Sequence, residues 1–147
     1  MNLGIYVDTI QKSPETFCII DQLNKGMESG KLDDASLFFD AVGFNDLPMK
    51  FGMFNATAMW AFTGTLLTTS IDTTSKALEI VNKLKVYYYH GWEENPNIFG
   101  LISLAKNPNI KTICRNGEDA IEFRRVTGES PVALVDNFSL EEILQQV

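Results

Sequence analysis

The sequence predicts one α/β domain over residues 1–147, a three-layer Rossmann-like fold with a mostly parallel sheet and helices on both faces. Predicted strands alternate with predicted helices along almost the whole chain, an order typical of a parallel sheet. Most of these strands are continuously apolar, as expected for strands that helices cover on both faces. The 147 residues are enough for one hydrophobic core and too few for two ordinary domains.

The first part of the chain contains three predicted strands, at residues 3–8, 35–40 and 50–55. Between the first two, Ser13 is a good helix cap and Pro14 suits the first helical position, because its missing N–H is not needed there. Gly30 stands where this helix is expected to end. A short helix is expected at residues 58–62.

The second part contains four predicted strands, at residues 64–70, 85–90, 111–115 and 132–136. The helices expected among them are one through Ala77, Leu78, Val81 and Leu84, one from Asn95 and Pro96 through Ala105, one at residues 118–126 closed by Gly128, and one that begins at Ser139. Asp72 or Thr73 is a suitable cap for the first of these helices. Ser139 and Glu142 have the spacing of a capping box.

The composition and the missing motifs exclude several classes of function. A net charge of −7 argues against a nucleic-acid partner, because phosphate contacts need clustered Lys and Arg. No apolar run reaches the roughly 18 residues of a membrane span, and the N-terminus lacks the features of a signal peptide, so a cytoplasmic protein without membrane contact is expected. The chain has no glycine-rich dinucleotide or phosphate loop and too few Cys and His residues for zinc, so no cofactor or metal is expected.

Functional-type side chains follow the predicted strands at their carboxyl ends, where an open parallel sheet normally binds its ligand. They are Asp8, Thr9, Asp40, Asn55, Ser70, Asp72, residues 90–93, Arg115, Asn116, Asp136 and Asn137. Residues 69–74 and 115–118 also lead into helix N-termini, which favour a phosphate or carboxylate. Thr69, Ser70 and Thr73 are therefore candidate ligand-binding residues, although Thr and Asp at a helix start commonly act as caps.

Two roles are open for each of the other candidate site residues. His90, the only histidine, is either the general base of a catalytic site or a structural imidazole at the mouth of the sheet. Trp92 either stacks on a flat ligand or covers the sheet edge, and Glu93 is either a ligand-binding acid or part of a solvated turn. Arg115 either binds an anion or pairs with an acid on its own helix.

Two stretches of the chain resemble the N-terminal Rossmann-like half of GT-B-fold glycosyltransferases: residues 64–94, GTLLTTSIDTTSKALEIVNKLKVYYYHGWEE, and residues 111–138, KTICRNGEDAIEFRRVTGESPVALVDNF. The chain is also similar to short glycosyltransferase-like proteins encoded by bacteriophages. The resemblance covers about the last two thirds of the sequence. By position, Thr69, Ser70, His90 and Arg115 would line the crevice.

The resemblance implies a domain that binds a sugar, a nucleotide sugar or another anionic small ligand. The donor-binding half of the family has no counterpart in these 147 residues, so the chain is expected not to be catalytic alone and to need a donor-half partner protein for transfer. The alternative is a non-enzymatic protein that self-associates, for example as a homodimer, through aromatic residues such as Phe51, Phe54 and Trp60.

Overall fold

Seven strands, all parallel, form the central sheet of the computed structural model, which describes residues 1–80 and 84–146. The strand order is β3-β2-β1-β4-β5-β6-β7. The strands are β1 (Asn2–Ile10), β2 (Asp34–Val42), β3 (Gly52–Asn55), β4 (Gly64–Thr68), β5 (Leu84–His90), β6 (Ile110–Cys114) and β7 (Ala133–Leu134). The sheet confirms the predicted fold class, and each of the seven predicted strands is present.

The order of the strands reverses between β1 and β4. The chain builds the sheet outward from β1 to β3, returns past β1, and then builds outward in the other direction from β4 to β7. β1 therefore pairs with β2 on one side and with β4 on the other, with Tyr6 opposite Phe38 and opposite Thr68. In doubly wound folds such a switch point opens a crevice at the carboxyl ends of the strands.

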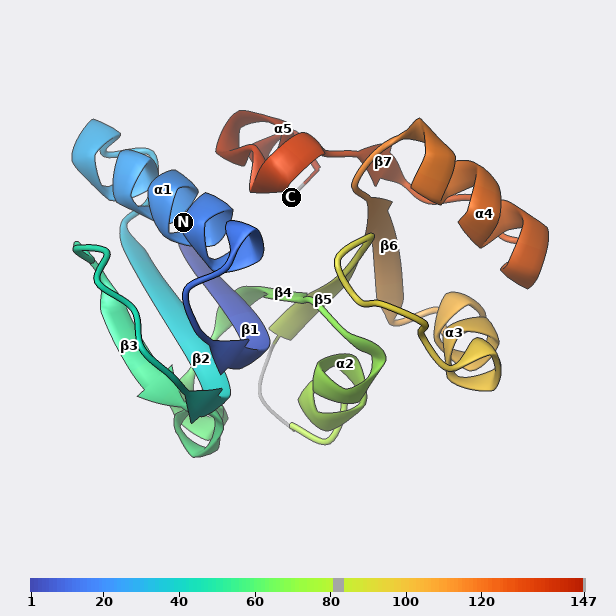
Figure 1. Cartoon of the computed structure of the whole chain (residues 1–147), viewed down its shortest axis with the longest axis horizontal. Helices are drawn as coiled ribbons and strands as arrows, with labels where there is room; N and C mark the ends of the chain where they lie inside the picture. Colours follow the sequence, from blue (N-terminus) through green and yellow to red (C-terminus); the bar gives the residue numbers. More distant parts are fainter. Residues whose placement is uncertain (81–83, 147) are drawn as a thin grey trace.

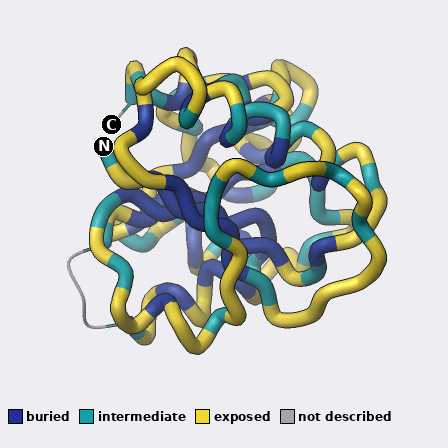
Figure 2. Tube along the Cα trace, turned by 90° about the vertical axis from the view of Figure 1, so that its left-hand side faces the viewer, coloured by how far each residue is buried: buried dark blue, intermediate teal, exposed yellow. Residues whose placement is uncertain are grey.

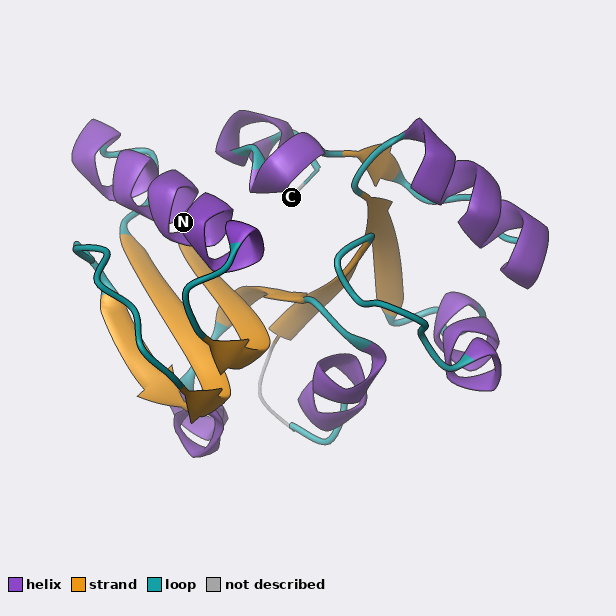
Figure 3. Cartoon of the chain, in the orientation of Figure 1, coloured by secondary structure: helices purple, strands orange, loops and turns teal. Residues whose placement is uncertain are grey.

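Helices cover both faces of the sheet, as Figures 1 and 3 show. They are α1 (Pro14–Ser29), the 3₁₀ helix η1 (Ala56–Ala61), α2 (Ile71–Ala77), α3 (Ile98–Ala105), α4 (Gly117–Thr127), the 3₁₀ turn η2 (Asp136–Phe138) and α5 (Leu140–Leu144). In Figure 1, α1 and α5 lie on one side of the sheet, and α2 and α3 lie on the other. Right-handed crossovers explain the places of α1, α2 and α3, because reversing the direction of strand addition moves the connecting helix to the opposite face.

The core is divided by the sheet into two sides. Side chains alternate between faces along a strand, so Ile5 packs with Leu23 of α1 while the neighbouring Tyr6 packs with Leu66 and Ala77 on the opposite face. Both faces of the central strands are buried, and Figure 2 shows the buried segments of the chain in the interior with exposed segments around them. The continuous apolar character of the strands follows from this double coverage.

The predicted caps of α1 and the predicted end of α4 at Gly128 are confirmed. The Ser13 side chain accepts a hydrogen bond from the backbone N–H of Thr16 at 3.2 Å, and Pro14 occupies the first helical position. Gly30 and Gly128 end the two helices in the left-handed conformation, with φ of 76° and 77°. Glycine adopts this conformation without the penalty that a Cβ imposes.

The helix after β4 differs from its prediction. Ser70, and neither Asp72 nor Thr73, is its cap, and Thr73 completes a reciprocal capping box with Ser70. The helix ends at Ala77, and Leu84, expected in the helix, is the first residue of β5. Leu84 pairs with Gly64 in the sheet, so a long-range strand contact overrides the local helical pattern. Val81 lies outside the described residues.

The C-terminal segment also departs from the prediction. The last strand, β7, has two residues where five were expected. Asn137 and Phe138 follow it with positive φ angles of 46° and 59°. Ser139 makes no capping hydrogen bond, because the chain turns here and the Glu142 carboxylate instead accepts from the backbone N–H of Asp136 at 3.2 Å.

Among the helices formed by the described residues, none combines the length and the apolar character needed to cross a membrane.

Candidate functional site

A crevice of about 210 Å³ opens at the switch point between β1 and β4. It is formed by the end of β1, the first turn of α1, the β4–α2 junction and the loop after β5. Its lining residues are Val7, Asp8, Thr9, Gln11, Glu15, Thr69, Ser70, Trp92 and Glu93. The crevice therefore lies where the strand order of an open α/β sheet predicts a ligand site.

The hydroxyl-bearing wall of the crevice is held rigidly. Thr69 is buried, and its hydroxyl donates a hydrogen bond to the Tyr6 carbonyl oxygen of β1 at 3.2 Å. Ser70 is buried as well and accepts a hydrogen bond from the Thr73 backbone N–H at 3.1 Å. These contacts tie the β4–α2 junction to β1, so both residues hold fixed positions at the crevice.

The crevice has an acidic character. Burial, followed by the charge of Asp8, raises the pKa of Glu15 to about 7. Burial also raises the pKa of Glu93, although the Ile71 backbone N–H opposes this rise by donating to its Oε2 at 3.0 Å. Among the described residues that line the crevice, none is a Lys or an Arg.

Trp92 belongs to a row of stacked groups that runs from Arg115 to Tyr89. The guanidinium carbon of Arg115 is 3.7 Å from the centroid of the indole, in cation–π geometry. The indole is parallel to the ring of Phe138, which stacks on Tyr89 with the centroids 4.2 Å apart. The Tyr89 hydroxyl donates to the Val135 carbonyl oxygen and accepts from the Phe138 backbone N–H, so the row is anchored in the core.

The structure brings four of the seven sequence-predicted site residues together: Thr69, Ser70, Trp92 and Glu93 line the crevice. Thr73 is fully buried and serves the capping box. Arg115 contacts Trp92 and approaches Asn137 at 3.5 Å, outside the crevice lining. His90 is part of a different cavity.

His90 is held inside the fold by two aromatic side chains. Its Nδ1 and the Tyr88 hydroxyl are 3.0 Å apart, and its ring centroid is 5.5 Å from that of Phe123. Burial lowers the pKa of His90, against the opposing charges of Asp119 and Glu122. His90 therefore has a structural hydrogen bond and does not face the crevice residues Asp8 and Glu15.

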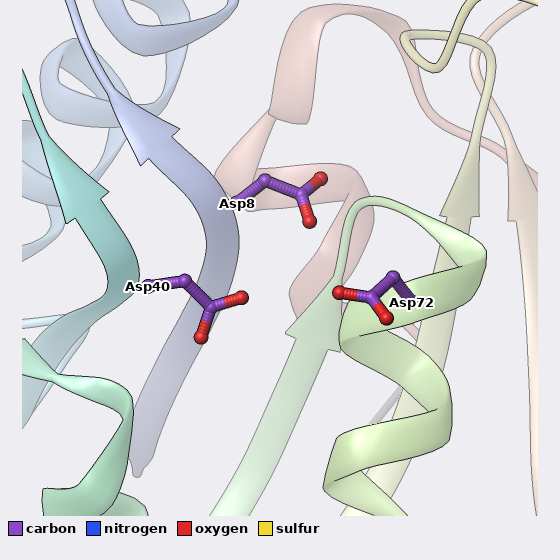
Figure 4. A group of neighbouring side chains, drawn as sticks. All are labelled: Asp8, Asp40 and Asp72. Atoms are coloured by element: carbon purple, nitrogen blue, oxygen red, sulfur yellow. The ribbon is translucent and has the colours of Figure 1, made fainter.

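A cluster of three carboxylates lies beside the crevice (Figure 4). Asp8, Asp40 and Asp72 each bring an oxygen within 4.8 Å of the others, and this group of acids has the geometry to hold a cation. The Lys76 ammonium already forms ion pairs at 3.0 Å with both Asp40 and Asp72. Positive charge at this cluster is thus supplied by the chain itself.

Sequence reasoning had placed Asp8, Asp40 and Asp72 at strand ends but had not grouped them, because their proximity depends on the order β2-β1-β4. Glu15 carried no signal at all. It is an ordinary first-turn helical acid in the sequence, and only the packing of α1 against the end of β1 places it in the crevice.

Comparison of the chain with protein-family models, with curated proteins and with solved structures finds no match in any of the three. Function is therefore inferred from the side chains of the crevice themselves.

Proposed function

We propose that the protein binds a sugar, either a free sugar or the sugar part of a nucleotide or nucleotide sugar, in the crevice between β1 and β4. The observation that carries the proposal is the chemistry of the lining. Three carboxylic side chains and three hydroxyl side chains converge there: Asp8, Glu15, Glu93, Thr9, Thr69 and Ser70.

These groups match a ligand that presents many hydroxyls. Carboxylates accept hydrogen bonds from hydroxyl donors, and such charge-assisted bonds are the stronger kind. Thr and Ser hydroxyl oxygens can accept hydrogen bonds from sugar hydroxyls. The Thr69 and Ser70 hydroxyls already donate within the fold, to the Tyr6 carbonyl oxygen and to the Thr73 hydroxyl, so they face a ligand as acceptors. The acidic lining favours the neutral, hydroxyl-bearing part of a ligand over its phosphate, because no cationic side chain among the described lining residues would neutralise an anion.

The size of the crevice supports a single ring as its occupant. Sites for drug-sized ligands are commonly about 300–1,000 Å³, whereas this crevice measures about 210 Å³. One sugar ring is the size class that fits, and any larger part of the ligand would extend beyond the rim.

In this proposal the chain acts like the acceptor-side half of a GT-B glycosyltransferase and is not catalytic alone. A binding role without turnover is supported by the position of His90, which lies in a separate cavity and is hydrogen-bonded to Tyr88. Glycosyl transfer would then require a donor-domain partner.

The test is a titration of the ¹⁵N-labelled protein with monosaccharides, nucleosides and UDP- and GDP-linked sugars, followed by ¹H–¹⁵N correlation spectra. Saturable shifts at the amides of Thr9 and Ser70 are expected for at least one compound. Asp8→Asn should weaken that binding by about tenfold, because it removes a charged acceptor. The matched control is Asp34→Asn. Asp34 is the first residue of β2, at the edge of the sheet opposite to the crevice, so this variant should bind the ligand as the unmodified protein does. No saturable shift with any compound, or equal affinity for Asp8→Asn and the control, would refute the proposal.

A second candidate, self-association into a homodimer, is favoured by one feature of the sheet edge. β3 is an edge strand, and it and η1 expose large apolar side chains: Met53 (40% exposed), Phe54 (44%) and Trp60 (52%). An edge strand with exposed apolar side chains is a template for pairing with a second copy.

Light scattering after size-exclusion chromatography, over about a hundredfold range of protein concentration, tests this candidate. A dimer that Phe54→Lys dissociates, and that Phe99→Lys on the distant and equally apolar α3 surface leaves intact, would support it. A monomer throughout the range would exclude it.

A further inference from the structure

A second cavity, of about 430 Å³, lies on the face of the sheet that α3 and α4 cover. It opens beyond the end of β5 and contains His90, which the crevice does not use. Glu93 lines both the cavity and the crevice, so the two sites share a wall.

His90 presents an unused hydrogen-bonding group in this cavity. The side chain is only 6% exposed, and its Nδ1 is bonded to the Tyr88 hydroxyl. Its other ring nitrogen, Nε2, has no hydrogen-bond partner among the residues that the structure describes, and it is the nitrogen left to face the cavity. His90 Nε2 is not among the fully buried unpaired atoms of the described residues, so it is open to a ligand or a water molecule in the cavity.

The hydrogen bond to Tyr88 sets which nitrogen carries the proton. Burial keeps Tyr88 protonated by raising its pKa, and burial keeps His90 neutral by lowering its pKa. Among the described residues, the Tyr88 hydroxyl has no other hydrogen-bond partner, so we assign its proton to the bond with His90 Nδ1, with the tyrosine as donor and Nδ1 as acceptor. Nε2 then carries the hydrogen and offers a donor to the cavity.

The remaining lining combines acidic and apolar side chains. Asp119 and Glu122 of α4 supply carboxylates, and no Lys or Arg belongs to the described lining. Glu122 pairs with Arg125, whereas Asp119 has no cationic partner in the described part of the chain. The apolar wall is made by Ile98, Leu101 and Val126.

Gly91 explains how Asp119 comes to lie at the end of β5. Its φ of +135° is one that other residues rarely adopt, and a Cβ at this position would lie 2.7 Å from the Asp119 Oδ2 and 2.6 Å from the Arg115 Cβ. Only a glycine lets the α4 carboxylate approach the strand so closely. The unpaired carboxylate and the His90 donor are therefore held at the same cavity by the backbone.

We propose that this cavity is a second binding site, for a primary amine with an apolar body and a hydrogen-bond acceptor at its far end. The ammonium group pairs with Asp119. The body packs on Ile98, Leu101 and Val126, and the acceptor takes the hydrogen bond from His90 Nε2. A half-buried carboxylate without a cationic partner attracts a cation, and the apolar wall favours a ligand with a hydrocarbon body over a hydrated metal ion.

Tyramine is the probe, and tyrosol, which carries a hydroxyl in place of the amine, is its neutral counterpart. In ¹H–¹⁵N spectra tyramine is expected to shift the amides of Gly91 and Asp119 with a Kd of about 1 mM, as a ligand of this size can reach. Tyrosol should bind about tenfold more weakly. Asp119→Asn should weaken tyramine binding about tenfold and leave tyrosol unchanged, since it removes a charged acceptor.

Glu118→Gln is the matched control, because Glu118 is an exposed acid one residue away that does not line the cavity. It should bind tyramine like the unmodified protein. Imidazole ¹⁵N spectra should show Nε2 as the protonated nitrogen and should shift on tyramine addition. The proposal is overturned if tyramine gives no saturable shift, if tyrosol binds equally well, if Asp119→Asn binds like the control, or if the shifts fall on Thr9 and Ser70 instead.

Discussion

Replacing Glu15 with glutamine tests the electrostatics of the crevice through the stability of the fold. Glu15 is half-buried beside Asp8, and its pKa is raised from an ordinary value of 4.5 to about 7. The folded protein therefore holds this proton more tightly than the unfolded chain. Between pH 4.5 and 7 the unfolded state binds fewer protons, so the free energy of unfolding falls as the pH rises through this window.

The two pKa values set the size of the effect. The difference between 4.5 and about 7 corresponds to at most about 3.4 kcal/mol at pH 8. Solvent at the open side of the crevice screens part of this cost, and the favourable position of an acid in the first turn of α1 offsets about 0.3–1 kcal/mol. Glu15→Gln removes the charge, so the variant should be more stable than the natural protein by about 1–3 kcal/mol at pH 8. At pH 4.5 the gain should fall below about 0.5 kcal/mol.

Urea unfolding followed by tryptophan fluorescence at pH 4.5 and pH 8 measures both differences. Glu118→Gln is the control, because Glu118 is an exposed acid in the first turn of α4. Its effect should stay below about 1 kcal/mol at both pH values. If Glu15→Gln changes stability by the same amount at pH 4.5 and pH 8, Glu15 does not carry a raised pKa and the crevice is less enclosed than the structure implies.

Three further substitutions test the backbone and the core, each by urea unfolding. Gly91→Ala should lower the free energy of unfolding by about 2–4 kcal/mol, because an alanine here has both an unfavourable φ and close neighbours around its Cβ. Gly30→Ala, with open space around it, should lower it by about 1–2 kcal/mol. Equal losses would contradict the close packing at Gly91. Ser70→Ala should lower the free energy of unfolding by about 1 kcal/mol, because it removes the cap of α2. Ser139→Ala should change it by less than about 0.5 kcal/mol, because the Ser139 side chain makes no capping hydrogen bond. A larger loss for Ser139→Ala than for Ser70→Ala would contradict the capping geometry. Tyr89→Phe should cost about 1–3 kcal/mol through the loss of two buried backbone hydrogen bonds, and a neutral result would show that water replaces them.

The elements most accurately predicted from the sequence are those whose causes are local. Ser13, Pro14 and Gly30 define α1 through backbone preferences that act within one turn of helix. The helix after β4 was predicted too long for the opposite reason. Leu84 has a suitable helical spacing, but pairing with Gly64 on the neighbouring strand fixes it as part of β5.

The same distinction applies to the candidate sites. The sequence shows that polar residues follow the strands. On this basis it predicts site roles for Thr69, Ser70, Trp92 and Glu93, and all four line the crevice. The separation of His90 from them was not expected. Alternation along β5 points Tyr89 toward the α1 face and His90 toward the α4 face, so residues one position apart serve different cavities.

The fold class and the edge of the sheet where ligands are expected can be predicted from the sequence alone, because the spacing of apolar residues and the helix caps are local properties of the chain. Which polar residues meet depends on the tertiary structure. The strand order places the end of β1 beside β4, and this brings Asp8 and Glu15 to Thr69 and Ser70. The packing of α4 against the end of β5 leaves Asp119 unpaired beside His90. These contacts join residues far apart in sequence, and no local preference encodes them.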